Sequence, residues 1–272
     1  MASVSVDAVA SGPPQPNASV RDRITVAGIG VRFGGVVALD DVSFGVPSGH
    51  VHGLIGPNGA GKTTLFDVIS GLRQPAAGRV LQDGRDITDW SAARRARRGL
   101  RRTFQRQQLF SWLSVEDNVL TALEWEGGGG GTVADLLALP SRTRRARRRR
   151  ERAREVMRRC GLADIGEVIA GTLPIGQARL VELARALVGD PTVLLLDEPT
   201  SALSAPECRQ VARIVTEHRD ATGCTVILVE HDLEFVMGLC DAVTVLEGGR
   251  VIFDGSTDDA RQDAGVRRAY LG

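Results

Sequence analysis

Lysine is almost absent from this sequence. The 272 residues include 34 basic side chains, and Lys62 is the one lysine among them. Because 33 acidic residues balance the basic ones, the net charge is +1 and the composition gives no sign of a general polyanion-binding protein. The length suits one large domain or two small ones.

Cysteine motifs and long apolar runs are absent too. The four cysteines form no CxxC pair and no spacing with histidine that is typical of a zinc site, so a reduced, cytosolic chain is the simplest interpretation. No stretch approaches the roughly 20 apolar residues of a membrane span. The first residues lack the basic and apolar regions of a secretory signal, and their Ser, Pro and Ala content predicts a disordered tail over 1–21.

One glycine-rich motif is complete. The stretch "GPNGAGKT", Gly56 to Thr63, matches G-x-x-x-x-G-K-[ST], follows an apolar strand and opens a helix. Its backbone N–H groups and the helix N-terminus can bind phosphate, Lys62 can contact the β- and γ-phosphates, and the Thr63 hydroxyl can ligate Mg²⁺. Arginine would replace this lysine poorly, because its flat fork is not a compact point charge. The residues expected to hold ATP here are Gly56, Pro57, Asn58, Gly59, Ala60, Gly61, Lys62, Thr63 and Thr64.

Acidic and polar residues follow three other apolar runs. "VLLLDEPT" places Asp197 where it can hold Mg²⁺, and Glu198 where it can orient or deprotonate a water. "VILVEHD" ends in His231, and its strand should lie beside the first, which would direct His231 toward the γ-phosphate. Gln105 in "TFQ" follows a short strand-like run and could reach the metal or the water. Taken singly, each would be an ordinary strand end. Together they predict catalytic roles for Lys62, Gln105, Glu198 and His231, and metal contacts for Thr63, Gln105 and Asp197.

Strands and helices alternate around this motif. Short strands over 24–55, arginine-rich helical segments over 92–170 and returning strands predict an α/β fold of the P-loop NTPase type. We expect a mainly parallel sheet core, an antiparallel β subdomain and a helical insertion. The pentaglycine at 127–131 can only be a flexible loop.

The motifs together resemble an ABC-type ATPase domain over about 24–255. They are "GPNGAGKTTLF", "TFQ", "LPIGQ", "LLLDEPTSALS" and "VEHD". Within that family, "VRFGGVVALDDVSF", "RTFQRQQLFSWLSVEDNV", "GQARLVELARAL" and "VRRAYLG" are most similar to the ATPase subunits of branched-chain amino acid importers. The likeness implies one domain over 22–272, with a helical subdomain at about 96–175 and a C-terminal helix at about 257–271.

The resemblance also implies roles for individual residues. Gln105 is similar to the Q-loop glutamine, His231 to the switch histidine, and Phe33 to the aromatic side chain that stacks on adenine. Members of the family act as head-to-tail pairs, in which the signature loop of one subunit covers the ATP of the other. Gly176 and Gln177 belong to that loop and are expected to contact nucleotide.

Two positions depart from the family pattern. The usual signature Leu-Ser-Gly-Gly-Gln is here Leu173-Pro174-Ile175-Gly176-Gln177, which lacks the serine hydroxyl, and Ser204 stands where an aspartate is usual. A missing hydrogen bond to a charged group is worth about 1.5–3 kcal/mol. We therefore expect an asymmetric pair, in which a second, different ATPase subunit supplies a normal signature.

The implied function is an ATP-driven motor, peripheral on the cytoplasmic face of the membrane. It would contact permease subunits, through residues such as Phe110, Trp112 and Leu113 within 106–120 unless these are core, and would serve an extracytoplasmic binding protein indirectly. The alternatives are a non-transport ATPase acting on nucleic acid or ribosomes, and an exporter of lipid. The arginine run at 142–154 favours a solvated helix face over a nucleic-acid grip or contact with anionic lipid, so no nucleic-acid partner is expected. The cargo stays open among branched-chain amino acids, urea, amides and other small polar solutes.

Overall fold

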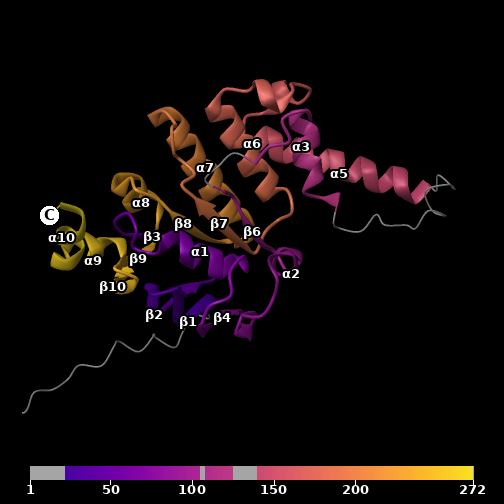
Figure 1. Cartoon of the computed structure of the whole chain (residues 1–272). Helices are drawn as coiled ribbons and strands as arrows, with labels where there is room; N and C mark the ends of the chain where they lie inside the picture. Colours follow the sequence, from indigo (N-terminus) through magenta and orange to yellow (C-terminus); the bar gives the residue numbers. More distant parts are fainter. Residues whose placement is uncertain (1–21, 105–107, 125–139, 272) are drawn as a thin grey trace, which may run out of the picture.

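The computed structural model describes residues 22–104, 108–124 and 140–271. The expected tail over 1–21, the pentaglycine at 127–131 and Gln105 lie outside the described residues. The described residues form two sheets and a group of helices, which are stacked as layers (Figure 1).

The first sheet is antiparallel and lies at one end of the molecule (Figure 1). Its strand order is β2-β1-β4-β5. The β-branched and apolar residues of its first two strands alternate in burial, as expected for a sheet with one face on a core. The strands are β1 (Asp22–Phe33), β2 (Val36–Pro47), β4 (Ala77–Gln82) and β5 (Arg85–Asp86).

The second sheet has the order β10-β9-β3-β8-β7-β6 and is parallel except for β10. Every residue of β3, β7 and β8 is buried, which explains their continuous apolar runs. The predicted parallel core and antiparallel subdomain are confirmed. The strands are β3 (Val51–Ile55), β6 (Leu100–Arg102), β7 (Val193–Asp197), β8 (Thr225–Val229), β9 (Ala242–Glu247) and β10 (Arg250–Ser256).

The parallel sheet separates two hydrophobic cores, because successive side chains of a strand point to opposite faces. Val193 and Leu195 pack with helix α1 (Lys62–Ser70) and the antiparallel sheet. Leu194 and Leu196 pack on the other side with the remaining large helices. Those are α3 (Val115–Thr121), α5 (Pro140–Arg159), α6 (Ile175–Leu187), α7 (Ala205–Thr222) and α8 (Leu233–Leu239). Smaller elements are α2 (Ala92–Arg97) and the 3₁₀ turns η2 (Ala163–Ile165) and η3 (Ala170–Thr172).

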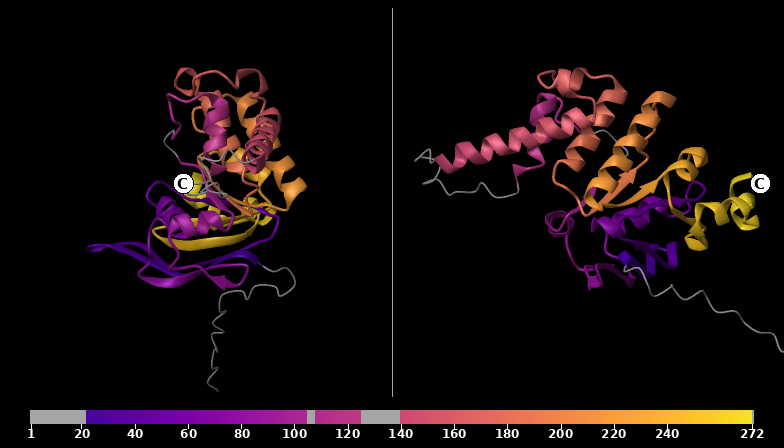
Figure 2. Two further views of the ribbon diagram at one scale, coloured as in Figure 1. Left: turned by 90° about the vertical axis from the view of Figure 1, so that its right-hand side faces the viewer. Right: turned by 180° about the vertical axis from the view of Figure 1, so that it is seen from behind.

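Helix α5 carries the arginine run and extends beyond the two sheets (Figure 2). The described arginines on it are mostly exposed, and several form ion pairs. These pairs are Arg147–Glu151 at 2.8 Å, Arg152–Asp190 at 2.6 Å and Arg154–Glu116 at 3.1 Å. Such contacts are typical of a solvated, salt-bridged helix face.

The expected C-terminal helix over 257–271 is wrong in one respect, because it consists of two helices. Helix α9 (Thr257–Gln262) is followed by Asp263, whose backbone is extended at φ −69° and ψ 129°. The carboxylate of Asp263 then accepts a hydrogen bond from the N–H of Val266 at 2.8 Å and caps helix α10 (Ala264–Leu271). The expected helical span 96–175 also contains β6, which belongs to the parallel sheet.

Candidate nucleotide-binding and hydrolysis site

The P-loop connects β3 with α1, in the strand-to-helix context that the sequence predicted. Gly56 and Gly61 have φ of 153° and 103°, where side chains are strained. A Cβ at Gly56 would overlap the carbonyl oxygen of Leu246, and one at Gly61 would lie 2.7 Å from the carbonyl oxygen of Ala38. Conformation and space therefore both require glycine, and the loop is held in place by its neighbours.

Lys62 lies across this loop. Its ammonium group donates hydrogen bonds to the carbonyl oxygens of Gly56 at 2.6 Å and Pro57 at 2.9 Å. The side chain is 6% exposed, and burial lowers the pKa of Lys62, while the nearby charge of Glu198 opposes that shift. Thr63 is exposed on the first turn of α1, which contains no acidic residue. The helix N-terminus thus keeps the positive potential that phosphate groups favour.

Glu198 and His231 meet at the carboxyl ends of two neighbouring strands. Strands β7 and β8 are parallel and pair Asp197 with Val229, which confirms the predicted adjacency. His231 Nε2 lies 3.0 Å from Glu198 Oε1. Glu198 also has a φ of 48°, a left-handed conformation that costs a residue with a side chain roughly 1–2 kcal/mol. Such strain gathers at functional sites.

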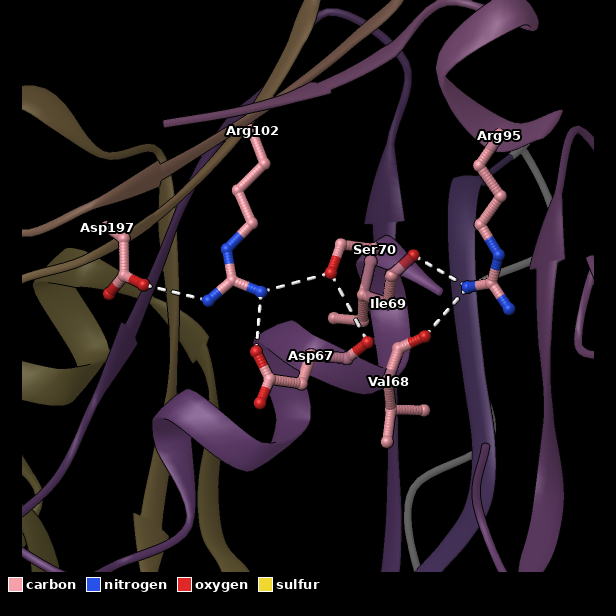
Figure 3. A network of polar contacts seen from close by, with 7 residues as sticks. All are labelled: Asp67, Val68, Ile69, Ser70, Arg95, Arg102 and Asp197. Atoms are coloured by element: carbon pink, nitrogen blue, oxygen red, sulfur yellow. Dashed lines mark hydrogen bonds and ion pairs between the residues drawn. The ribbon is translucent and has the colours of Figure 1, made fainter. Parts of the chain in front are cut away.

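Asp197 is buried beside this pair and is bound by an arginine that the sequence did not single out. Arg102 Nη2 donates to Asp197 Oδ2 at 2.9 Å (Figure 3). Burial raises the pKa of Asp197, and the hydrogen bond and charge of Arg102 oppose that rise. An ion pair that is 6% and 5% exposed keeps a carboxylate available at the end of β7.

Glu230 is a second residue that sequence reasoning missed. It lies between β8 and His231, is 4% exposed, and accepts hydrogen bonds from the N–H and Oγ1 of Thr200 at 2.8 and 2.6 Å. Its other oxygen accepts from the N–H of His231 at 3.2 Å. Glu230 therefore ties the loop after Glu198 to the histidine. An acid ending the apolar run "VILVE" was the available signal.

Phe33 lies at the tip of the β1–β2 hairpin and is 44% exposed. Val31, two residues earlier, pairs with Leu39, whose side chain reaches to 2.7 Å from the position of a Cβ on Gly61. Two residues of strand span about 7 Å, so the ring is within reach of a base whose phosphates lie in the P-loop. The guanidinium of Arg73 already lies 4.4 Å from the centre of the ring. The exposed ring is therefore compatible with stacking on a base, which stays a prediction.

Gly176 and Gln177 lie on the first turn of α6, a helix that packs on the other side of the parallel sheet from α1. Pro174 is the N-cap and contributes no side-chain hydrogen bond to the helix. Gly176 is buried against Glu207 of α7, whereas Gln177 is exposed. Within one chain this turn packs against α7 through Gly176 and Glu207.

The residues present fit ATP and Mg²⁺. Gly59 has a φ of 80° and open space around it, and the carbonyl oxygens of Gly56 and Pro57 hold the buried ammonium of Lys62 beside the loop. Mg²⁺ is usually held by one or two carboxylates together with substrate phosphates, which matches a single buried Asp197 next to Glu198. Gln105, the third expected metal contact, lies outside the described residues.

Known proteins resemble the whole of this arrangement. The family model for ABC transporters matches residues 39–201. The chain is 34% identical over 252 residues to the high-affinity branched-chain amino acid transport ATP-binding protein BraF of Pseudomonas aeruginosa, covering 93% of this chain and 98% of that protein. It is also 34% identical to LivG of Escherichia coli, a protein of the same description, over 92% of this chain and 97% of that protein.

Solved structures agree. A nucleotide-free ATP-binding cassette from an ABC transporter matches with a TM-score of 0.78 and 30% identity over 92% of this chain and 99% of that one. An ADP conformation of an ATP-binding cassette matches with the same values. The P-loop, the acids after β7 and the histidine after β8 stand in the order that the sequence resemblance implied. The chain therefore belongs to the ABC transporter family, as one of its nucleotide-binding, ATP-hydrolysing cassettes.

Proposed function

We propose that the chain is the motor subunit of an importer, which dimerises on ATP and drives a membrane permease for uptake of branched-chain amino acids or a similar small polar solute. The identity to BraF and LivG over nearly the full length of both proteins supports this choice. No helix of the described residues is long and apolar enough to cross a membrane. We propose a peripheral place on the cytoplasmic face, held by the permease, with an extracytoplasmic binding protein delivering the solute.

The contacts support the proposed catalytic roles. Lys62 would bind the phosphates and Glu198 would orient or deprotonate the attacking water, while His231, 3.0 Å from Glu198, would hold that carboxylate and face the γ-phosphate. When bound, Mg²⁺ neutralises charge on the β- and γ-phosphate oxygens. Thr63, Asp197 and Gln105 are the residues proposed to hold it, and Phe33 is proposed to stack on the adenine.

An exposed apolar edge of the helical layer is the proposed permease contact. Trp112 is 72% exposed and Phe110 39% exposed, with their rings 5.8 Å apart. Val168 and Ile169 are also exposed, and two backbone hydrogen bonds hold their segment beside the first: the N–H of Val115 donates to the carbonyl oxygen of Val168, and that of Ala170 to the carbonyl oxygen of Leu113. Leu113, named with them from the sequence, is half-buried. An apolar patch of this kind on a water-soluble surface marks an interaction site.

A heterodimer is favoured over a homodimer. Pro174 supplies neither a hydroxyl nor a backbone N–H at the start of α6, although the helix N-terminus itself is intact. This chain thus keeps its own catalytic set but offers a poorer signature to its partner. A second, different ATPase subunit with the usual serine would complete one of the two sites.

Co-purification tests the proposal. The full chain, isolated from its own cells in mild detergent, should bring down integral membrane permease subunits and a second ATPase subunit. Trp112→Asp should lose the permease while keeping ATP binding, because the patch lies outside the P-loop. Nuclease-sensitive RNA or DNA in place of permease would favour the alternative of an ATPase acting on nucleic acid and would overturn the motor assignment. A permease whose adjacent genes encode no binding protein would favour export.

A further inference from the structure

Arg102 joins three elements that surround the proposed metal site. It is the last residue of β6, and its guanidinium binds Asp67 Oδ1 at 2.7 Å and Ser70 Oγ at 3.0 Å through Nη1. Through Nη2 it binds Asp197 Oδ2 at 2.9 Å (Figure 3). One side chain therefore connects the P-loop helix α1 with the end of β7, over separations of 35 and 95 residues in sequence.

The guanidinium of Arg102 is held in one position by its surroundings. It is 6% exposed, and it lies 5.6 Å from the ring centre of Phe66 and 5.3 Å from that of Phe104. Thr103, the next residue, accepts a hydrogen bond from the backbone N–H of Asp197 at 3.2 Å. The backbone and the carboxylate of Asp197 are thus both held by consecutive residues at the end of β6.

Stability alone does not account for this arrangement. Buried ion pairs can often be replaced by apolar side chains with little loss of stability, because desolvation offsets much of the attraction. Arg95 provides the contrast within the same view (Figure 3). It is fully buried and caps α1 through the carbonyl oxygens of Val68 and Ile69, both at 2.7 Å, with no carboxylate among these partners. Arg95 serves the helix, whereas Arg102 engages a site residue.

We propose that Arg102 is a positioning residue for Asp197. It holds Oδ2, so that Oδ1 is the oxygen presented to Mg²⁺, and it sets that oxygen relative to α1, the helix that carries Lys62 and Thr63. The inference rests on the proposed metal role of Asp197. Residues that orient a metal ligand typically contribute 10- to 100-fold to metal affinity or activity, which gives the expected size of the effect.

The test measures metal binding without turnover. Mn²⁺ is titrated into the ADP complex of the full chain and followed by electron paramagnetic resonance. Arg102→Met should weaken Mn²⁺ binding by about tenfold or more, while ADP binding in EDTA stays within about twofold. Arg102→Lys should be intermediate, since a point charge can reach one carboxylate but lacks the fork that joins Asp67 and Asp197.

Two further variants separate positioning from folding. Asp67→Asn removes the anchor on α1 and should weaken Mn²⁺ binding less than Arg102→Met does. Arg95→Met removes the other buried arginine that binds α1 and should lower stability without changing Mn²⁺ affinity. Equal losses of Mn²⁺ and metal-free ADP binding in Arg102→Met would mean a purely structural role and overturn the proposal.

Asp197→Asn separates the positioning role of Arg102 from the metal-binding role of Asp197, on which it rests. If Asp197→Asn weakens Mn²⁺ binding and Arg102→Met does not, the positioning role fails while the metal role stands. If Asp197→Asn leaves Mn²⁺ binding unchanged, the metal role of Asp197 fails and the role of Arg102 falls with it.

Discussion

The carboxylate of Glu207 lies directly against the Cα of Gly176, so closely that a Cβ on residue 176 would overlap it. Ser204 holds Glu207 there, because its N–H and its hydroxyl both donate to Oε2, at 2.7 and 2.6 Å. These bonds lower the pKa of Glu207. The signature turn and Ser204, which stands where an aspartate is usual, are thus joined through Glu207 at one contact between α6 and α7.

Gly176→Ala should destabilise the chain for this reason alone. Alanine normally improves a helix by about 0.5–1 kcal/mol over glycine, but here its methyl group must displace Glu207 from Ser204. We expect Gly176→Ala to lower the urea midpoint of the parent chain, and to raise that of Glu207→Ala, where the methyl group has room. A single variant as stable as the parent chain would contradict the packing.

Pro174→Ser should change ATPase activity far more than stability. Serine can adopt the extended conformation of the N-cap, φ −55° and ψ 153°, and would gain about 1 kcal/mol by accepting a helix N–H. Loss of proline costs about 0.4–1 kcal/mol through the unfolded state, so the two effects nearly cancel. A restored hydroxyl facing the partner's phosphate is worth about 1.5–3 kcal/mol, or at least tenfold in rate.

The measurement is steady-state ATPase of the purified chain alone, with urea unfolding as the control for stability. The asymmetric-pair proposal predicts a low, non-cooperative rate for the unmodified chain and a clear gain for Pro174→Ser. A normal, cooperative rate that the substitution does not raise would remove the case for a second, different subunit.

The parts of the site that lie in order along the chain were predictable from the sequence. Apolar runs ending in Asp197 and His231 indicated buried parallel strands, and one intervening helix placed them side by side. Arg102 was not predictable, because "LRRTFQ" is one arginine-rich stretch among several. The role of Arg102 depends on its contacts with Asp67 and Asp197, which are remote in sequence.

The same reason applies to the contact between Gly176 and Glu207. Each residue has a local explanation of its own: Gly176 belongs to the signature motif and Glu207 is a capping-box acid. Only the packing of α6 on α7 brings them together. The break at Asp263 had a local signal, since Asp is a strong N-cap, but helix-forming residues on both sides hid it.

His52 is a buried histidine in β3, directly before the P-loop. Its Nε2 lies 2.7 Å from Thr244 Oγ1, and the hydroxyl of Thr244 donates to Asp254 at 2.6 Å. The hydroxyl proton is thereby engaged, so Nε2 must carry its own proton and donate to Thr244. Burial, followed by the charge of His50, lowers the pKa of His52 to about 3.

Acid should therefore unfold the chain partly through His52. In the unfolded state His52 binds a proton below about pH 6.5, whereas in the folded state it binds one only below about pH 3. The free energy of unfolding therefore falls as the pH falls across this window. The slope per histidine is at most about 1.4 kcal/mol per pH unit. His218, whose pKa burial lowers to about 4, adds a second contribution of the same sign.

His52→Gln should flatten this acid dependence, because glutamine keeps a donor for Thr244 but does not titrate. Urea unfolding between pH 4 and pH 7 should show the free energy of unfolding falling less steeply with pH than in the parent chain. The difference in slope should correspond to the uptake of about one proton fewer on unfolding. Parallel curves for the two proteins would show that His52 does not resist protonation in the folded state.

Glu198 and His231 should behave as one catalytic unit. Glu198→Gln removes the base and should lower ATP hydrolysis by about 10²- to 10⁴-fold while nucleotide binding changes little, because Lys62 and the P-loop remain. His231→Ala removes the partner that holds Glu198 at 3.0 Å and should lower the rate in the same direction. Residues that act as a unit are not additive, so the double variant should be no slower than Glu198→Gln alone.

Single-turnover hydrolysis and equilibrium binding of a fluorescent ATP analogue separate the two effects. Glu217→Gln serves as the control, since Glu217 is an exposed acid on α7 that pairs with Arg213 at 2.8 Å and lies away from the strand ends. Its rate should match the parent chain. If the double variant instead lost the product of the two single losses, Glu198 and His231 would act independently, and the 3.0 Å contact would have no catalytic meaning.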